Sequence, residues 1–551
     1  MRAEVWKRFL HGSDGESGYA AAFPAQARQI LRAIEFGAPV DFEGDRSKHQ
    51  RLPNHPIKDQ YLQKVRDVIN ADVAALKKAG PIAPHPWPSV RGQPLWASPI
   101  GAVPKKGSSK VRVIHDLSAP KGGDSVNAGI LDGSLDISSF GHAARIVREF
   151  GSGAWLIKLD VEDTYKQVPV RPEDWHLLGF EFEGKLYYER VLPFGLRSSC
   201  RLWELFAAAL HFMCERLSCG AAHKVVHYVD DFLFVVSPIG GEAAAARLLQ
   251  GALALCAELG VPMAPDKVEG PAHILVFLGI ELDALKLEAR LPADRLDQLH
   301  SLMLEWQSFT RASIKQLQSL AGLLNFAAAC VAPGRVYTRR IIAHTTRLLS
   351  LRCGPHAPCA LTPAVQADVA WWVEFLRSWN GVSILYEAEW TDAPLIELFT
   401  DACLRGYGAY YRGRWFEGAW SPEELAATAR EQRVSMPFLE MRALVLAAAT
   451  WGRHWRGKKI TFRCDCMPVV QAFAEMRSRS AVQMHQIRTL HQIAARCGFD
   501  FRVFHVAGVT NIVADVLSRD GDCQEFRANR PEAQAKPDAV VRPPLPTADD
   551  R

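Results

Sequence analysis

Two adjacent carboxylates, Asp230 and Asp231, lie between two apolar runs of the sequence. The runs, residues 225–226 and 232–236, consist of β-branched, aromatic and leucine side chains, which predicts two buried strands. The carboxylates fall where such a hairpin would turn, so the turn would present both of them at one edge. Aspartate is also a common turn former, and an isolated pair would indicate only a turn.

A third carboxylate, Asp160, makes a metal-binding role for the pair a stronger prediction than a simple turn. Residues 154–159 form another apolar strand candidate, which runs directly into Asp160. Mg²⁺ prefers carboxylate oxygens as protein ligands. Carboxylates at neighbouring strand ends can hold two such ions about 3.5 to 4 Å apart, where the ions activate an attacking hydroxyl and stabilise the leaving oxygen. Asp160, Asp230 and Asp231 therefore predict a two-metal phosphoryl-transfer site.

The order of further motifs resembles that of retroelement reverse transcriptases. Along the chain these motifs are Leu159-Asp160, Leu192-Pro193-Phe194-Gly195, Tyr228-Val229-Asp230-Asp231, Lys267 and Phe277-Leu278-Gly279. The resemblance covers residues 85–520. It implies an α+β, multidomain chain in which a right-hand polymerase, with fingers, palm and thumb, precedes a ribonuclease H-like mixed α/β domain.

The resemblance also implies roles for cationic residues. Lys105 and Arg112 would bind the triphosphate of an incoming deoxynucleotide, and Lys267 would donate a proton to the departing pyrophosphate. Lys105 alone would be read as part of a solvated basic hairpin. Arg112 lies between apolar residues and is the stronger candidate.

Apolar residues receive roles from the same resemblance. Tyr165 would stand beneath the sugar, where its ring would clash with a 2′-hydroxyl, the group that distinguishes ribonucleotides. Phe194 would line the nucleotide pocket, and Phe277, Leu278 and Gly279 would brace the primer end. Without the motif, Tyr165 would be an ordinary half-buried tyrosine.

A second set of acidic residues follows in the C-terminal part of the sequence. Asp401 and Asp465 end strand-like runs, and Glu440 and Asp515 lie in helix-like stretches. A glutamate in a helix usually lies on a solvated face, but Glu440 stands between the two strand-ending aspartates. The set resembles the ribonuclease H domain fused behind retroelement polymerases, which implies that the four carboxylates bind two metal ions and hydrolyse RNA in an RNA–DNA hybrid.

The sequence departs from that domain at two positions. No histidine lies just ahead of Asn511, where many relatives have one, and Cys466 follows Asp465 where relatives often carry a polar residue. We expect the first departure to affect product release and the second to affect the rate rather than the fold.

The length of 551 residues indicates about three or four domains, and 48% apolar residues suffice for folded cores. Residues before 54 show little periodic structure. The expected order is an N-terminal extension over 1–84 with a helix at 56–79, fingers and palm over 85–290, a thumb-like helical region over 291–345, a connection over 346–391, a ribonuclease H-like domain over 392–523 and a disordered tail over 524–551.

Charge and cysteine content restrict the partners. A net charge of +5 permits nucleic-acid binding without requiring it, and the basic patches at 105–112, 335–340 and 453–459 could bind phosphates or be solvated surface. The 12 cysteines show no metal-binding spacing, and the sequence contains neither a signal-peptide core nor a membrane-length apolar run. We therefore expect an intracellular protein of the cytoplasm, the nucleus or both, neither secreted nor in a membrane.

The predicted function is that of a retrotransposon RNA-directed DNA polymerase with ribonuclease H activity, with two Mg²⁺ (Mn²⁺ possible) at each active site. Its partners would be an RNA template, a DNA primer, RNA–DNA hybrid, dNTPs and other retroelement proteins. The segments at 116–130 and 517–519 are closer to DIRS-like elements than to retroviruses. Two alternatives stay open: a domesticated or decayed protein that binds nucleic acid without catalysis, and a polymerase that copies RNA into RNA.

Overall fold

The computed structural model describes residues 1–12, 18–82, 88–104, 111–135, 137–331, 334–378, 382–384, 398–428, 435–478, 480–519, 526, 530, 533–534 and 536–545. The chain divides into two compact units. The first joins Met1–Ala143 to Gly153–Phe277, and the second joins Ala144–Ser152 to Leu278–Arg551.

A four-stranded antiparallel sheet lies at the centre of the first unit. Its strand order is β11 (His223–Tyr228), β12 (Asp231–Val236), β8 (Trp155–Asp160) and β13 (Glu269–Ala272). Valine, leucine and phenylalanine of β8 and β12 are buried, as their β-branched and aromatic composition predicts. The helices α6 (Ser199–Cys214) and α7 (Gly241–Leu259) supply apolar side chains to the same core.

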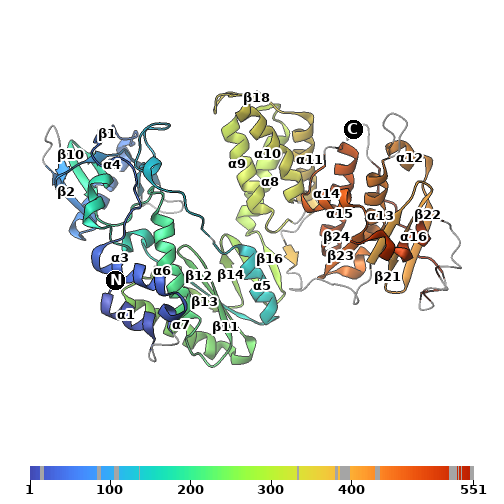
Figure 1. The fold of residues 1–551 in the computed structure, drawn as a ribbon, viewed down its shortest axis with the longest axis horizontal. Helices are drawn as coiled ribbons and strands as arrows, with labels where there is room; N and C mark the ends of the chain where they lie inside the picture. Colours follow the sequence, from blue (N-terminus) through green and yellow to red (C-terminus); the bar gives the residue numbers. More distant parts are fainter. Residues whose placement is uncertain are drawn as a thin grey trace. The chain divides into compact units, whose positions relative to one another are not determined.

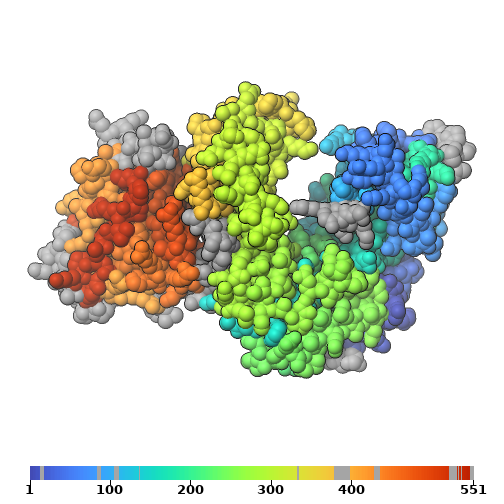
Figure 2. All heavy atoms as spheres, turned by 180° about the vertical axis from the view of Figure 1, so that it is seen from behind, coloured from blue at the N-terminus to red at the C-terminus, as the bar shows by residue number. Residues whose placement is uncertain are grey.

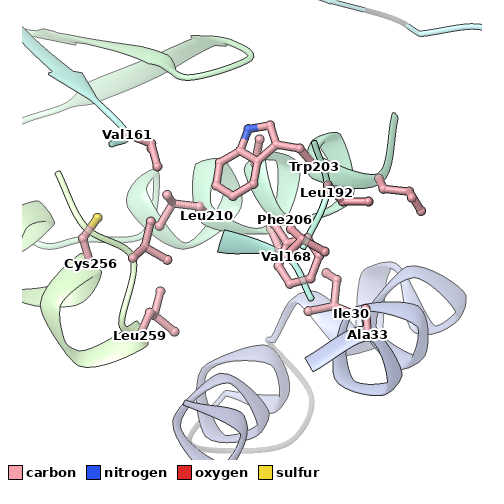
Figure 3. Close-up of a cluster of buried hydrophobic side chains, with 14 of the residues drawn as sticks. Ile30, Ala33, Val161, Val168, Leu192, Trp203, Phe206, Leu210, Cys256 and Leu259 are labelled. Atoms are coloured by element: carbon pink, nitrogen blue, oxygen red, sulfur yellow. The ribbon is translucent and has the colours of Figure 1, made fainter. Parts of the chain in front are cut away.

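Among the described residues before 54 are three helices, α1 (Ala3–His11), α2 (Tyr19–Ala22) and α3 (Pro24–Phe36). Figure 3 shows Ile30 and Ala33 of α3 beside the core side chains of α6. The indole N–H of Trp6 donates to the carbonyl of Leu259 at 3.0 Å. The expectation of little periodic structure before residue 54 is therefore wrong. Helices α1 and α3 are amphipathic, and their buried side chains pack on the core of the first unit.

A five-stranded sheet and a separate hairpin also belong to the first unit. The sheet order is β1 (Gln50–Arg51), β5 (Trp96–Ala97), β9 (Gly179–Phe182), β10 (Lys185–Glu189) and β2 (Lys78–Ile82). The hairpin pairs β6 (Ile100–Pro104) with β7 (Val111–His115). Helix α4 (Asp59–Ala74) lies within the stretch 56–79 and packs on β2 and β7.

Most of the second unit follows Leu278. Its strands β15 (Ile280–Asp283) and β16 (Glu288–Arg290) pair with each other, and β16 also pairs with β19 (Val382–Ile384). Helices α8 (Ala293–Gln307), α9 (Ile314–Ala327), α10 (Gly334–Ser350) and α11 (Pro363–Ser378) follow. In Figure 2 these helices are the lime to yellow mass. Trp372 and Leu376 of α11 are core residues.

The helices of this region are joined to the C-terminal part by a buried carboxylate. One oxygen of Asp368 on α11 accepts from Arg340 of α10 at 3.3 Å and from Arg488 of α15 (Ala481–Cys497) at 2.8 Å. The Asp368 side chain is only 1% exposed. Arg488 also lies over the ring of Tyr337, which stacks on Trp371. The clamp therefore ties three helices that come from distant parts of the sequence.

A five-stranded mixed sheet organises the C-terminal part of the second unit (Figure 1). Its order is β22 (Arg414–Ala419), β21 (Gly406–Tyr411), β20 (Leu398–Ala402), β23 (Lys459–Cys464) and β24 (Asp500–His505). The first three strands are antiparallel, whereas β20, β23 and β24 are parallel. Helices α13 (Met436–Trp451), α14 (Met467–Ala474) and α16 (Ile512–Arg519) pack on this sheet.

The described residues after 524 dock on this sheet, so the expectation of a disordered tail is wrong for them. The amide of Asp538 donates to the carbonyl of Trp415 at 2.8 Å. The carboxylate of Asp538 accepts from the indole of Trp451 and from Arg414, both at 2.8 Å. Phe526 is buried against Tyr410 and Trp415. Composition did not reveal this docking because the contacts are mostly hydrogen bonds along an extended segment.

Membrane insertion has no support in the described helices, because none of them combines the length and the apolar character needed to cross a bilayer.

Candidate active sites

The first site is the turn between β11 and β12. Tyr228 pairs with Asp231, so the turn consists of Val229 and Asp230 alone. Val229 has a φ of 56°, a left-handed conformation that is strained for a β-branched residue. On β12, Asp231 lies directly opposite Asp160 of β8. The register thus brings together the three carboxylates that the sequence singled out.

Hydrogen bonds hold the turn from two sides. The amide of Val161 donates to the carbonyl of Asp230 at 3.0 Å. The indole N–H of Trp203, on α6, donates to the carbonyl of Val229 at 2.7 Å. Trp203 was not among the residues chosen from the sequence. No local pattern could reveal this bond, because it joins residues from separate elements.

The three carboxylates are buried or partly buried and repel one another. Burial, followed by the charges of Asp230 and Asp160, raises the pKa of Asp231 to about 6. Burial and the charge of Asp160 also raise the pKa of Asp230, although Lys267 and Arg112 act in the opposite direction. Such clustering stores negative charge that a cation would neutralise.

Lys267 forms an ion pair with one of these carboxylates, that of Asp160. Its Nζ donates to Oδ2 of Asp160 at 2.6 Å. The amide of Ala264 donates to the carbonyl of Asp160 at 2.9 Å, which fixes the segment that carries Lys267. Burial lowers the pKa of Lys267, but the bond to Asp160 and the surrounding carboxylate charges raise it overall. Its predicted contact with the nucleotide stays a prediction.

Three of the predicted nucleotide-pocket residues form one cluster. The rings of Tyr165 and Phe194 have centroids 5.1 Å apart, and the guanidinium of Arg112 lies 5.0 Å from the centroid of Phe194. Burial, a hydrogen bond with Cys200 and the charge of Asp230 raise the pKa of Tyr165. The cluster is therefore close to the turn that carries Asp230. Lys105 lies outside the described residues.

The predicted primer-contact residues form a sharp turn. Phe277 is fully buried at the end of β14 (Ile274–Phe277) and belongs to the first unit, whereas Leu278 and Gly279 begin the second. Leu278 and Gly279 both have positive φ, at 50° and 79°. A Cβ on Gly279 would lie 3.2 Å from the ring of Phe326 on α9. Contact with a primer stays a prediction.

The second site gathers the four C-terminal carboxylates. Asp401 lies in β20, Asp465 directly follows β23, and Glu440 and Asp515 lie on α13 and α16. Because β20 and β23 are parallel neighbours, the two aspartates come to the same edge of the sheet. Asp401 interacts electrostatically with the other three carboxylates. Ligand atoms of Glu440, Asp465 and Cys464 all lie within 4.8 Å of one another.

Burial dominates the electrostatics of this second site. It raises the pKa of Glu440 to about 9, with further contributions from Asp401 and Asp465. It also raises the pKa of Asp401 to about 6, against a hydrogen bond from Ser518 that lowers it. In each case a buried carboxylate faces other carboxylates, as at the first site.

Ser518 of α16 and Asn511, the residue just before that helix, are two supporting residues that sequence reasoning missed. The hydroxyl of Ser518 donates to Oδ2 of Asp401 at 2.5 Å, and the side-chain amide of Asn511 donates to the carbonyl of Thr400 at 3.1 Å. Asn511, Asp515 and Ser518 are spaced by four and three residues, which places them on one helix face. That spacing is the signal that could have identified them.

A glycine lets α16 approach the sheet. A Cβ on Gly408 of β21 would lie 2.3 Å from the Cβ of Leu517. Any larger residue would therefore push the helix, and Asp515 with it, away from the sheet edge. Arg519 donates to Asp515 at 2.7 Å and orients its carboxylate.

Sequence comparison gives a family for part of the chain. Residues 103–282 match the family described as reverse transcriptase (RNA-dependent DNA polymerase). Polyprotein P3 of Commelina yellow mottle virus is 21% identical over 379 residues, and the Gag-Pol polyprotein of Walleye dermal sarcoma virus is 26% identical over 137 residues. These matches take in 68% and 25% of this chain but only 18% and 7% of the viral polyproteins.

Two solved structures share the fold. The foamy viral protease-reverse transcriptase dRH in complex with dsDNA matches with a TM-score of 0.50 and 15% identity, over 91% of this chain and 81% of that one. The foamy viral protease-reverse transcriptase in complex with dsDNA matches with a TM-score of 0.50 and 16% identity, over 92% and 97%. At such identity the likeness concerns the fold alone. Residues 103–282 therefore form a reverse transcriptase-family segment, related to viral pol polyproteins, within an α+β multidomain chain.

Proposed function

We propose that the protein is an RNA-directed DNA polymerase that adds deoxynucleotides to a primer 3′ end and also cleaves the RNA strand of RNA–DNA hybrids. The observation that carries the proposal is the register of β8 against β12, which sets Asp160 opposite Asp231 beside the turn residue Asp230. Three carboxylates on two adjacent strand ends suit phosphoryl transfer, because that reaction needs charge neutralisation more than a protein nucleophile.

Both carboxylate clusters fit divalent metal ions. The raised pKa values of Asp231 and Glu440 result first from burial and then from neighbouring carboxylates, so the charged forms of these groups lack the stabilisation that a bound cation would supply. Asp160, Asp230 and Asp231 would hold Mg²⁺ or Mn²⁺ at the first site, and Asp401, Glu440, Asp465 and Asp515 at the second. When bound, the ions would activate the attacking oxygen and stabilise the leaving oxygen. The matched family supports a requirement for divalent ions.

The other residues of the first site would orient the substrate. Arg112 presents a cation beside Phe194 and would bind the triphosphate, together with Lys105. Tyr165, held against Phe194, would stand under the sugar and reject a 2′-hydroxyl. Lys267 holds Asp160 and would release it as the triphosphate binds, after which its ammonium would donate a proton to the pyrophosphate.

At the second site, two side chains would hold the metal-binding carboxylates in position for RNA hydrolysis. Ser518 fixes Asp401 from α16, and Arg519 fixes Asp515. The mixed sheet supports this assignment, since three antiparallel strands followed by parallel ones place two strand-borne and two helix-borne carboxylates together. We propose an RNA template, a DNA primer, dNTPs and RNA–DNA hybrid as partners, and a retrotransposon of DIRS-like or related type as the source.

The test measures labelled deoxynucleotide incorporation on a primed RNA template with Mg²⁺, beside Asp230→Asn. A second assay follows cleavage of a labelled RNA–DNA hybrid, beside Glu440→Gln. We expect each variant to lose its own reaction and to keep the other. Tight hybrid binding without either reaction in the intact chain would instead favour a domesticated binding protein. Equal incorporation of ribonucleotides would favour a polymerase that makes RNA.

A further inference from the structure

Trp203 makes a contact that the proposed chemistry does not explain. Its side chain is 1% exposed on α6, and its indole N–H donates to the carbonyl of Val229 at 2.7 Å. Val229 is the first residue of the two-residue turn, and Asp230 is the second. The bond thus reaches the peptide unit that joins these two residues.

The turn needs such a restraint. Val229 has a φ of 56°, which a β-branched residue adopts only where its surroundings enforce it. The amide of Val161 restrains the far side of the turn through the carbonyl of Asp230, at 3.0 Å. On the near side Trp203 provides the side-chain restraint. Loss of its N–H would leave the Val229 carbonyl without this donor and the strained residue free to relax.

Trp203 is itself fixed by aromatic packing. Its ring stacks on Phe206, with centroids 6.2 Å apart and an interplanar angle of 12°. Phe206 in turn meets Trp6 edge-on at 5.5 Å. Figure 3 shows Trp203 and Phe206 within the apolar core that α6 shares with α3. The donor therefore comes from a rigid part of the fold.

We infer that Trp203 is a positioning residue for the carboxylate turn: its indole N–H holds the strained peptide of Val229, and so keeps Asp230 beside Asp160 and Asp231. This inference rests on the proposed polymerase function of that site. Trp203 does not touch substrate in this role. It acts by keeping the third carboxylate of the set in place for metal ions.

The test compares two variants that make the same chemical change. Trp203→Phe keeps the aromatic body and removes the donor at the turn. Trp6→Phe removes an equivalent indole bond, to the carbonyl of Leu259 at 3.0 Å, in the same core. Both should lower the unfolding temperature. Only Trp203→Phe should lower kcat by about tenfold, the effect expected of one buried bond, and raise the Mg²⁺ concentration for half-maximal rate, with KM for dNTP unchanged.

A glycine variant provides a rescue. Glycine adopts positive φ without strain, so Val229→Gly should shrink the kcat deficit that Trp203→Phe causes. A second readout is independent of catalysis: Mn²⁺ binding followed by electron paramagnetic resonance, in a Glu440→Gln background that weakens the second site. We expect Trp203→Phe to lower the Mn²⁺ affinity of the first site. The decrease should be in the same direction as that caused by Asp230→Asn.

The two proposals fail differently. No incorporation by the intact chain would refute the polymerase function, while the Mn²⁺ measurement would still decide the role of Trp203. Trp203→Phe and Trp6→Phe with equal kcat, equal Mg²⁺ dependence and equal Mn²⁺ affinity would show that Trp203 serves the core alone.

Discussion

Buried carboxylates are the shared chemical feature of the two candidate sites. Asp231 at the first site and Glu440 at the second both have raised pKa values because burial and neighbouring carboxylates disfavour their charged forms. The metal-free fold therefore carries an electrostatic cost that depends on pH. Glu440, with a pKa of about 9, shows the effect most strongly.

The pH dependence of stability follows from the sign of that shift. Between the unfolded pKa of about 4.5 and the folded value, the folded chain keeps a proton that the unfolded chain has released, so raising the pH favours unfolding. We expect the unfolding temperature of the metal-free protein to fall from about pH 5 to pH 8, and Glu440→Gln to reduce that fall. Thermal unfolding with a chelator measures both slopes; parallel curves would contradict the assignment.

We expect Tyr165 to select the sugar of the incoming nucleotide. Because its ring lies against Phe194, Tyr165→Ala should open space for a 2′-hydroxyl and lower the preference for deoxynucleotides by at least about tenfold. Tyr165→Phe keeps the ring and serves as the control that retains the preference. Competing dNTP and rNTP incorporation on one template gives the ratio. An unchanged ratio in the alanine variant would exclude a gating role.

Residue chemistry was only partly predictable from the sequence. Asp160, Asp230 and Asp231 could be selected because strand-like runs flank them, and local pattern is what a sequence displays. Trp203 showed no local signal of its role, and Ser518 showed only its helical spacing from Asp515, since each acts on a residue far away in the chain. Their contacts exist only once α6 and α16 have packed.

Among the elements, the Asp368 clamp joins α10 and α11 to α15. One carboxylate oxygen serves both Arg340 and Arg488, and the other is buried without a hydrogen-bond partner among the described residues. The clamp ties the helical region after residue 291 to the sheet that carries the second site. An electrostatic contact of this kind is costly to break, because the remaining partner stays buried.

Breaking the clamp should loosen α15. We expect Arg488→Met to destabilise the second unit by about 3 kcal/mol, because Asp368 would keep only the longer contact to Arg340. Hydrogen exchange of α15 amides and thermal unfolding measure the change. Arg347→Met, an exposed position on the same helix as Arg340, is the control and should have little effect. Equal exchange rates in both variants would show that the clamp does not hold α15.

The elements also show where pattern reading succeeds and fails. The strands β8 and β12 were apparent because buried strands need β-branched and aromatic residues. Helices α1 and α3 were overlooked, because their amphipathic patterns run over only 9 and 13 residues. Trp6 and Ile30 are both fully buried, yet each looks unremarkable within its own segment.

For the molecule as a whole, the docked tail changes how the C-terminal part is stabilised. Asp538 accepts from Arg414 on the edge strand β22 and from Trp451 on α13. Arg542 also forms an ion pair with the buried Glu424. Proline-rich composition predicted disorder, but hydrogen bonds to the edge of a sheet need no apolar repeat. Composition indicates whether a segment can form a hydrophobic core by itself. The tail does not need to, because it packs on the core of the adjacent sheet.

Loss of the tail contacts should therefore weaken the C-terminal part. We expect Asp538→Ala to lower its stability by about 1–3 kcal/mol, since the indole of Trp451 loses its acceptor. Lys536→Ala changes an exposed neighbour and should be neutral. Thermal unfolding and hybrid cleavage at elevated temperature report the effect. Identical unfolding of the two variants would show that the docked segment contributes nothing.

The two-residue turn at Val229 and Asp230 makes the hairpin sensitive to length. Side chains alternate between the faces of a strand, so one inserted or deleted residue in β11 or β12 would turn every following side chain to the opposite face. Asp231 would then no longer oppose Asp160. Under the proposed function, a chain that gained or lost one residue in this hairpin should lose primer extension as fully as Asp230→Asn, although all three carboxylates are still present in its sequence.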